Sequence, residues 1–270
     1  MNIDLYKDEC LDALKEIEDK SVDLILVDLP YKQIAQKWDC EIDINKLWEQ
    51  YDRVLKDNAV ILLFASGTFA YELYNAHPKQ FKYELIWKKN SPTGMNSVSY
   101  RPMKYFEKIM VFIKGKTRKC TYNPIPKPRE NEQGYLYGKY AKKSGHNNHI
   151  PNEMETRLIK YDENWVQPSD ILEFKVVPNR GKLHCTQKPV DLLEWLIKTY
   201  SNEGDTVLDN AMGSASTGIA CINLNRNFIG MEKYDDNYDV ALNRILDKIQ
   251  DEEKEIFLST YRNPIREELK

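Results

Sequence analysis

Residues 22–31 read VDLILVDLPY and are the most informative stretch of this chain. A short apolar run that is closed by a proline turn is typical of a buried strand. Because Pro30 ends the run, Asp28, Leu29 and Tyr31 are expected just past the carboxyl end of that strand. Ligands of open α/β sheets bind at such carboxyl ends, so these residues form a candidate site.

The four residues from Asp28 to Tyr31 carry the groups needed to hold a planar ring that bears an amine. The Asp28 carboxylate and the Leu29 carbonyl are hydrogen-bond acceptors, and the ring of Tyr31 offers a stacking face. An ordinary strand-to-loop turn has the same composition. The tetrapeptide alone therefore leaves a surface turn as the alternative.

A second site is predicted at residues 205–218, which read DTVLDNAMGSASTG. This pattern indicates a short strand, an acidic residue, a turn of small residues that lets a ligand approach the backbone, and a helix. Gly213 and Gly218 have the spacing of a phosphate-binding loop, but Ile-Ala at 219–220 stands where Lys and Ser or Thr are required. The turn also lacks G-x-G-x-x-G. A ligand without phosphates is therefore expected.

The strand expected next, FIGME at residues 228–232, ends in Glu232, about where a ribose-binding carboxylate belongs. A nucleoside without phosphates is implied, and S-adenosyl-L-methionine is the common cofactor of that description. The alternative is an ordinary βαβ unit with a tight turn.

A nucleoside-binding βαβ unit normally opens its domain, yet the residues that follow Glu232 are too few to complete a doubly wound sheet. The remaining strands must come from the amino-terminal part. Strands are expected there at residues 1–6, 22–27, 60–64, 83–87 and 108–112, and helices at 11–17 and 44–55. This alternation favours an α/β fold with a mostly parallel, doubly wound sheet, circularly permuted so that the cofactor half comes last.

Three motifs in this order resemble the permuted, beta-type amino-DNA methyltransferases. They are Asp28–Tyr31, HCTQKP at residues 184–189, and residues 209–218. The resemblance covers nearly all of the chain apart from 117–181. It implies a Rossmann-like S-adenosylmethionine-dependent methyltransferase with an inserted target-recognition region. Leu29 departs from the family motif D/N/S-P-P-Y/F/W, and Met212 and Ala215 depart from the family turn D-x-F-x-G-S-G.

The resemblance also assigns roles to residues and to parts of the chain. In the family the first motif holds the target base, which gives the catalytic set Asp28, Leu29, Pro30 and Tyr31. The other two motifs hold the cofactor, and the residues expected to bind it are Asp8, Thr186, Gln187, Lys188, Asp209, Asn210, Ala211, Gly213, Ser214 and Glu232. The expected division is a catalytic half at 1–116, an inserted recognition region at 117–181 and a cofactor half at 182–270.

An exocyclic base amine is a poor nucleophile because its lone pair is delocalised into the ring. Two acceptors on the amine hydrogens, Asp28 and the Leu29 carbonyl, would localise that lone pair, while Tyr31 stacks on a base swung out of the duplex. The sequence has no Pro-Cys dipeptide to supply the thiolate that methylation of cytosine at carbon 5 needs. An amine is therefore the expected methyl acceptor.

The formal net charge of −3 conceals an uneven distribution of charge. Nine basic residues lie between Arg101 and Arg129, with Glu107 as the only acid among them. Such a cluster can neutralise phosphates, with strong salt dependence. The candidate DNA-binding residues are Arg101, Lys104, Lys116, Arg118, Lys119, Lys127 and Arg129. A solvated basic face with a disordered loop is the alternative.

Double-stranded DNA is thus the expected substrate, with adenine N6 as the acceptor because an Asp at the first motif position resembles the adenine enzymes. Cytosine N4 is the alternative within the class. Two further classes stay open, namely a catalytically silent DNA-binding protein of the same fold and a methyltransferase that acts on small molecules or proteins. A cognate restriction endonuclease and a homodimer are further candidate partners.

The five cysteines include no C-x-x-C pair, and the sequence shows no signal peptide and no long apolar span. These features predict a reducing cytoplasm without a membrane partner, and the family resemblance implies that it is the cytoplasm of a bacterium, for a bacterial or a phage-encoded protein. His146 and His149 are interpreted as exposed loop residues. Together with Cys120 and Cys185 they are too scattered to predict a zinc site.

Overall fold

The structure is a computed structural model that describes residues 1–30, 42–128, 165–178, 180, 187–249 and 254. The chain forms two compact units, of which the larger contains Met1–Asn123 and Asp170–Lys270 and the smaller Pro124–Ser169. The described part of the smaller unit contains a two-stranded antiparallel sheet of β6 (Lys127–Pro128) and β7 (Trp165–Val166).

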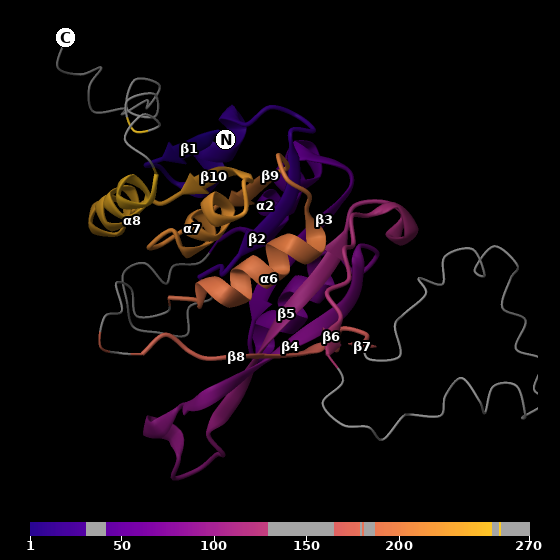
Figure 1. The fold of residues 1–270 in the computed structure, drawn as a ribbon, viewed down its shortest axis with the longest axis vertical. Helices are drawn as coiled ribbons and strands as arrows, with labels where there is room; N and C mark the ends of the chain where they lie inside the picture. The colour runs from indigo at the N-terminus through magenta and orange to yellow at the C-terminus, as the bar shows by residue number, and fades with distance from the viewer. Residues whose placement is uncertain (31–41, 129–164, 179, 181–186, 250–253, 255–270) are drawn as a thin grey trace, which may run out of the picture. The chain divides into compact units, whose positions relative to one another are not determined.

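The larger unit is built on an eight-stranded sheet with the order β1-β10-β9-β2-β3-β5-β4-β8 (Figure 1). Its strands are β1 (Ile3–Tyr6), β2 (Val22–Val27), β3 (Leu55–Ala65), β4 (Phe81–Thr93), β5 (Lys104–Ile113), β8 (Ile171–Phe174), β9 (Thr206–Asp209) and β10 (Asn227–Met231). Strands β1, β10, β9, β2 and β3 are parallel, whereas β5 is antiparallel to both its neighbours. The residues that follow β2, β9 and β10 therefore meet at one edge of the sheet.

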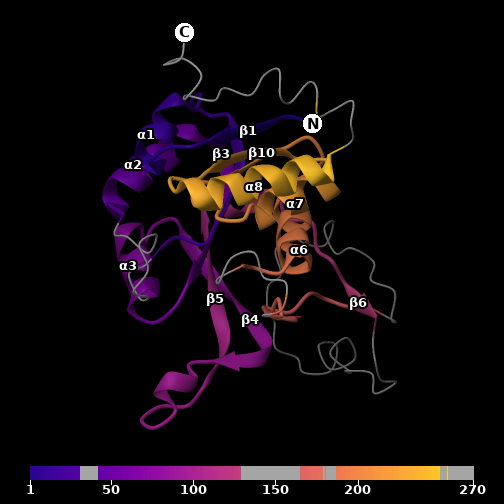
Figure 2. The ribbon, with the colours of Figure 1, turned by 90° about the vertical axis from the view of Figure 1, so that its left-hand side faces the viewer.

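Helices cover both faces of this sheet (Figure 2). Leu24 and Leu26 of β2 share one core with α6 (Val190–Tyr200), α7 (Ser216–Asn223) and α8 (Asp235–Lys248). Ile25 and Val27 share the opposite core with α1 (Cys10–Ala13), α2 (Ile44–Val54) and α3 (Thr68–Ala76). A strand that is buried on both faces needs a continuous apolar run, which explains why β2 has the bounds that the sequence predicts.

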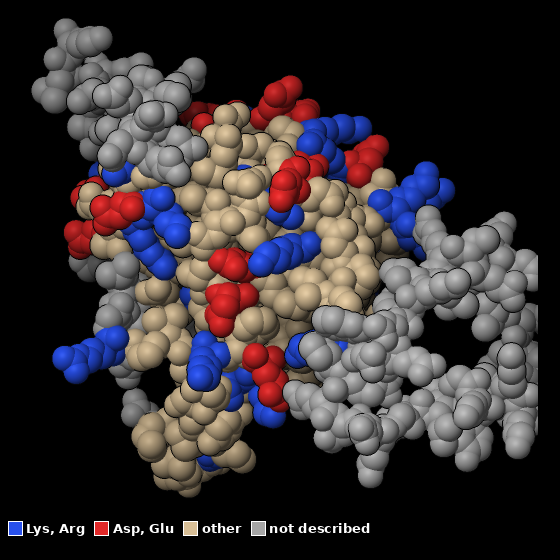
Figure 3. Space-filling model, in the orientation of Figure 1, with Lys and Arg blue, Asp and Glu red and all other residues tan. Residues whose placement is uncertain are grey.

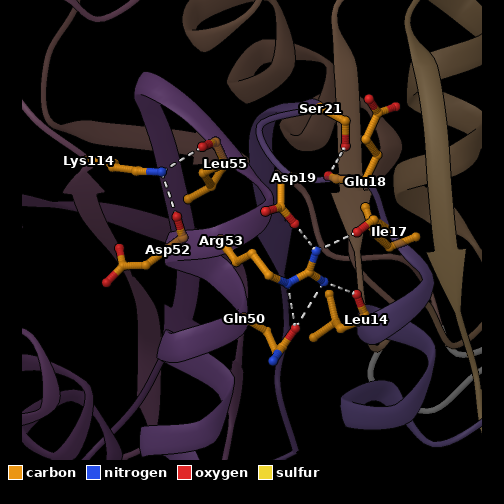
Figure 4. Close-up of polar contacts among 10 residues, drawn as sticks. All are labelled: Leu14, Ile17, Glu18, Asp19, Ser21, Gln50, Asp52, Arg53, Leu55 and Lys114. Atoms are coloured by element: carbon orange, nitrogen blue, oxygen red, sulfur yellow. Dashed lines mark hydrogen bonds and ion pairs between the residues drawn. The ribbon is translucent and has the colours of Figure 1, made fainter.

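Arg53 joins α2 to the segment that leads into β2 (Figure 4). Its Nη1 donates to the carbonyl of Ile17 at 2.6 Å and pairs with Asp19, and its Nη2 donates to the carbonyl of Leu14. One guanidinium thus satisfies two carbonyls of the turn that precedes β2. This arrangement fixes where β2 enters the sheet and so where Asp28 leaves it.

Two elements differ from the sequence prediction. The helix expected at 11–17 is a single α-helical turn, α1, followed by the 3-10 helix η1 (Leu14–Glu16). Ile171–Phe174, which was expected in the inserted region 117–181, is strand β8 and pairs with β4 in the main sheet. β8 has only four residues, and only Leu172 among them is buried. It therefore lacks the alternation of apolar and polar residues by which a strand is recognised in a sequence.

The hairpin of β4 and β5 projects from the sheet, and we call its residues 88–106 the arm, of which Lys88 and Lys89 still pair with β8 (Figures 1 and 2). The arm contains the 3-10 helix η2 (Met95–Ser97), which is preceded by Gly94 in a left-handed conformation with φ of 95°. Several large apolar side chains of the arm are exposed, namely Met95, Val98, Tyr100, Tyr105 and Phe106. Exposed apolar groups gathered on one projecting element are typical of an interaction surface.

Candidate active site

A cleft of about 1310 Å³ lies at the carboxyl edge of the parallel strands in the larger unit. Its walls contain residues that follow β1, β2, β3, β9 and β10, and residues of the arm. Ligand pockets commonly have volumes of roughly 300–1,000 Å³. The cleft can therefore accommodate a nucleoside-sized cofactor together with a second planar group.

Most of the predicted catalytic and cofactor residues line this one cleft. They are Asp8, Asp28, Leu29, Pro30, Gln187, Lys188, Asp209, Asn210, Ala211, Gly213, Ser214 and Glu232. Tyr31 and Thr186 lie outside the described residues. Two segments that are far apart in the sequence thus face one another, because β2 pairs with β9.

The turn after β9 is held by the buried carboxylate of Asp209. One Asp209 oxygen accepts a hydrogen bond from the Thr217 hydroxyl at 2.6 Å, and the other accepts from the Ala211 amide at 3.1 Å. Burial raises the pKa of Asp209 to about 7, and the two hydrogen bonds oppose that rise. Both oxygens are thus already engaged in shaping the turn.

Glu232 follows β10 and faces the same turn. Its Oε2 accepts from the Gly213 amide at 3.1 Å and its Oε1 from the Tyr234 amide at 2.9 Å, while burial raises the pKa of its carboxyl group. Gly213 has a φ of 51°, a conformation that glycine adopts without strain. The turn and Glu232 therefore form one wall, with backbone amides and a carboxylate at the cleft.

The other wall contains Asp28, which lies just past β2. Its Oδ2 is paired with the ammonium group of Lys188, and its Oδ1 is buried without a hydrogen bond to any described residue. Burial raises the pKa of Asp28, the nearby Glu107 carboxylate raises it further, and Lys188 opposes both effects. Oδ1 is thus an acceptor that a ligand amine could use.

Lys188, which was predicted to bind the cofactor, lines the cleft, and its ammonium group lies between Asp28 and Glu107. The Nζ atom is 3.6 Å from Oε2 of Glu107, whose other oxygen pairs with Lys89. Burial alone would lower the pKa of Lys188, but the two carboxylates raise it. Burial alone would raise the pKa of Glu107, but Lys188 and Lys89 lower it to about 2.

Sequence reasoning did not assign Glu107 or Lys89 to the site. The available signal was that Glu107 is the only acid in the basic run from Arg101 to Arg129. Its partner Lys89 could not be identified without the register of β4 on β5.

Within the larger unit, the predicted DNA-binding residues do not come together on one surface. Arg101 and Lys104 line the cleft, where Lys104 donates to Ser66. The ten residues of β5 then span roughly 33 Å across the sheet. Lys116, Arg118 and Lys119 lie beyond its far end, where the Lys116 amide donates to Asn58 at 3.1 Å. Lys127 belongs to the smaller unit, and Arg129 is outside the described residues.

Within the described ranges, no helix has both the length and the apolar composition required to cross a bilayer. In the same part of the chain, no three His, Cys, Asp or Glu side chains are grouped so as to hold a metal ion. His146, His149 and Cys185 fall outside it.

The sheet order and the helices on both faces are those of a Rossmann-like α/β fold, and the solved S-adenosylmethionine-dependent methyltransferases that superpose on this chain confirm the predicted fold class. The solved complex of M1.HpyAVI with SAM superposes on this chain with a TM-score of 0.61 and 25% identity, covering 90% of this chain and 98% of that one. The PvuII DNA methyltransferase, described as cytosine-N4-specific, superposes with a TM-score of 0.62 and 15% identity, covering 94% and 90%, and shows the fold alone.

The sequence comparisons place the chain within that class. Residues 22–243 match the N6/N4 DNA methylase family. The chain is 30% identical over 241 residues to the type II methyltransferase M1.MboII of Moraxella bovis, an alignment that covers 84% of this chain and 90% of that protein. The protein therefore belongs to the N6/N4 DNA methylase family.

Proposed function

We propose that this protein transfers a methyl group from S-adenosyl-L-methionine to the N6 amine of adenine in double-stranded DNA. The observation that carries the proposal is the Asp28 carboxylate, which enters the same cleft as the nucleoside-type turn and whose buried Oδ1 has no partner among the described residues. The choice of adenine over cytosine rests on the resemblance of the Asp28 motif to the adenine enzymes. The target-base motif precedes the cofactor turn in the chain, and this order supports the permuted, beta-type arrangement.

The residues around the turn fit the proposed cofactor. Ala211, Gly213 and Ser214 leave the backbone accessible, and Glu232 offers a carboxylate to ribose hydroxyl groups. No lysine or arginine belongs to the turn, which agrees with a ligand that lacks phosphates. The M1.HpyAVI complex with SAM supports this choice. When bound, S-adenosylmethionine supplies an electrophilic methyl group on a sulfonium centre.

The other wall of the cleft would position the amine. Oδ1 of Asp28 and the Leu29 carbonyl would accept the two amine hydrogens, which orients the nitrogen lone pair out of the ring plane. Leu29 is held by its own buried side chain, 1% exposed, and by Pro30 after it. Placing two reactants in line is worth several orders of magnitude in rate, so most of the catalysis would come from this positioning.

The arm is the proposed contact with the DNA next to the extruded base. It carries the basic residues Lys88, Arg101 and Lys104 and no acidic residue, while a fourth basic residue, Lys89, is buried against Glu107. Figure 3 shows its projecting end as mostly uncharged surface with basic groups nearby. Because Thr93, Gly94 and Arg101 of the arm also line the cleft, DNA that delivers a base there must pass beside the arm.

We predict that Arg101→Ala weakens DNA binding and reduces the slope of log affinity against log salt by about one. Lys116→Ala is the matched control, because Lys116 lies past the far end of β5. Fluorescence anisotropy with a labelled duplex between about 50 and 200 mM salt measures both slopes. Equal slopes in the two variants would contradict the assignment of the arm.

The function itself is tested by mass spectrometry of nucleosides from DNA incubated with the protein and S-adenosylmethionine. N6-methyldeoxyadenosine is the expected product. N4-methyldeoxycytidine as the sole product would show that the target base is cytosine, and the proposed mechanism of transfer to an amine would still hold. Methylation of protein, or no methylated nucleoside at all, would contradict the function.

The proposed function also implies a partner, an assembly and a place of action. M1.MboII is named as a type II methyltransferase, so a cognate restriction endonuclease is a proposed partner. A homodimer is the proposed assembly, to be checked by light scattering. The bacterial cytoplasm, where the DNA lies, is the proposed place of action.

A further inference from the structure

Four charged side chains form a continuous row along the Asp28 wall of the cleft, and we call them the charge row. Lys89 of β4 pairs with Glu107 of β5, Glu107 lies 3.6 Å from Lys188, and Lys188 pairs with Asp28. The lysine side chains are only 4% and 10% exposed. Two buried cations are thus balanced by two carboxylates, which is the condition under which buried charges persist.

The charge row conflicts with the role of Asp28 as an acceptor. The ammonium group of Lys188 has three donors and a full charge, and it occupies Oδ2 of Asp28. A neutral base amine can reach Oδ1, but the cation at Oδ2 draws negative charge from the whole carboxylate and so weakens Oδ1 as an acceptor. Asp28 therefore holds the amine more strongly if Lys188 moves away.

The structure provides a second place for the ammonium group. Oε2 of Glu107 is buried and forms no hydrogen bond within the described residues. Its 3.6 Å distance from Nζ is too long for a hydrogen bond, and a shift of less than about 1 Å would form one. The Phe64 ring lies 4.8 Å from Nζ and can attract the cation during that shift.

We propose that Lys188 is a positioning residue that alternates between two carboxylates, capping Asp28 in the free enzyme and moving to Oε2 of Glu107 when the target base enters. This inference rests on the proposed function, because the base amine at Oδ1 is the group that is held more strongly once the ammonium has moved. Lys188 stays protonated throughout, so no proton transfer is involved. Glu107 is the second positioning residue, since it receives the cation.

Removing either positioning residue should shift the pH profile, in opposite directions. The charged groups that face Asp28 are Lys188, Glu107, Lys89 and, across the cleft, Asp209. Asp28 must be ionised to accept, so activity rises as the pH rises through its pKa. Lys188 lowers that pKa and Glu107 raises it. Lys188→Met should therefore move the acidic limb to higher pH, and Glu107→Gln should move it to lower pH.

The effects of these variants on kcat should differ from their effects on the pKa of Asp28. In Glu107→Gln the ammonium group has only a neutral amide to move to, so kcat should fall roughly tenfold. In the double variant Glu107→Gln/Lys188→Met no cation remains on Asp28, and kcat should recover above that of Glu107→Gln alone. Glu84→Gln is the matched control, because Glu84 pairs with Lys108 at 2.8 Å across the same two strands, outside the cleft.

The experiment measures kcat and KM for methyl transfer to DNA against pH, together with cofactor affinity and the thermal midpoint. A Glu107→Gln protein with the rate and pH profile of Glu84→Gln, or a double variant no faster than Glu107→Gln, overturns the alternation of Lys188. If the Glu107→Gln protein does not fold, the Glu107→Asp protein is used to test the alternation of Lys188. Its shorter carboxylate should lower kcat without moving the acidic limb, and an unchanged kcat overturns the inference. A wild-type protein that transfers no methyl group would instead refute the proposed function.

Discussion

Asp28→Ala is expected to lower methyl transfer to DNA by roughly 100- to 1000-fold, the usual effect of removing one group that stabilises the transition state. The variant loses the carboxylate that accepts from the amine, while Lys188 keeps Glu107 as its partner and the fold should persist. Asp28→Asn should have an intermediate rate of methyl transfer, because it keeps one carbonyl acceptor without the charge. Initial rates with labelled cofactor are measured for the wild type and the two variants.

The matched control for this prediction is Asp12→Ala. Asp12 is an exposed carboxylate that pairs with Lys15 at 2.7 Å, away from the cleft. The Asp12 variant should retain the wild-type rate, and cofactor affinity should be unchanged in all of these variants because Asp28 is not part of the cofactor turn. Full activity in Asp28→Ala would remove the basis of the mechanism.

Glu232→Ala is expected to weaken S-adenosylmethionine binding roughly 10- to 100-fold. A hydrogen bond to a charged group is worth about 1.5–3 kcal/mol, and the loss of the carboxylate also frees the Gly213 amide that it holds. Titration calorimetry measures the affinity. Glu203→Ala, which removes an exposed acid before β9, is the control. Affinities that agree between the two variants would mean that the cofactor binds elsewhere.

The Asp209→Ala variant should also bind the cofactor less well, for a different reason. Both Asp209 oxygens hold the turn through Thr217 and Ala211, so the variant would lose the shape of the wall. Asp209→Ala should therefore lower the thermal midpoint as well as the affinity, whereas Glu232→Ala should act mainly on affinity.

Local patterns were sufficient to predict the elements on which the site is built. The bounds of β2 follow from its apolar run, and the turn after β9 follows from its small residues. The placement of Asp28 and Asp209 in one cleft also follows, because Asp28 comes just after β2, Asp209 ends β9, and these parallel strands are neighbours. The site residues that depend only on a strand end could therefore be named from the sequence.

The residues that were missed depend on the register between strands. Glu107 reaches Lys188 only because β5 runs against β3 and begins at the cleft, which no local pattern encodes. The length of β5 separates Arg101 from Lys116, so a basic run that is continuous in the sequence is divided in space. Lys188 shows a related limit of prediction from sequence motifs. The motif places this lysine near the cleft, but it does not predict which atoms its side chain contacts.

The strand order has a consequence for how the chain reaches this structure during synthesis. Ile3 of β1 pairs with Phe228 of β10, 225 positions later, and β9 lies between β10 and β2. A growing chain therefore cannot complete the five parallel strands until β9 and β10 have left the ribosome, and β1 has no strand to pair with before then. Contacts between such distant residues make folding slow. The protein should accordingly fold more slowly than a protein whose first strand pairs with a strand that follows it closely in the chain.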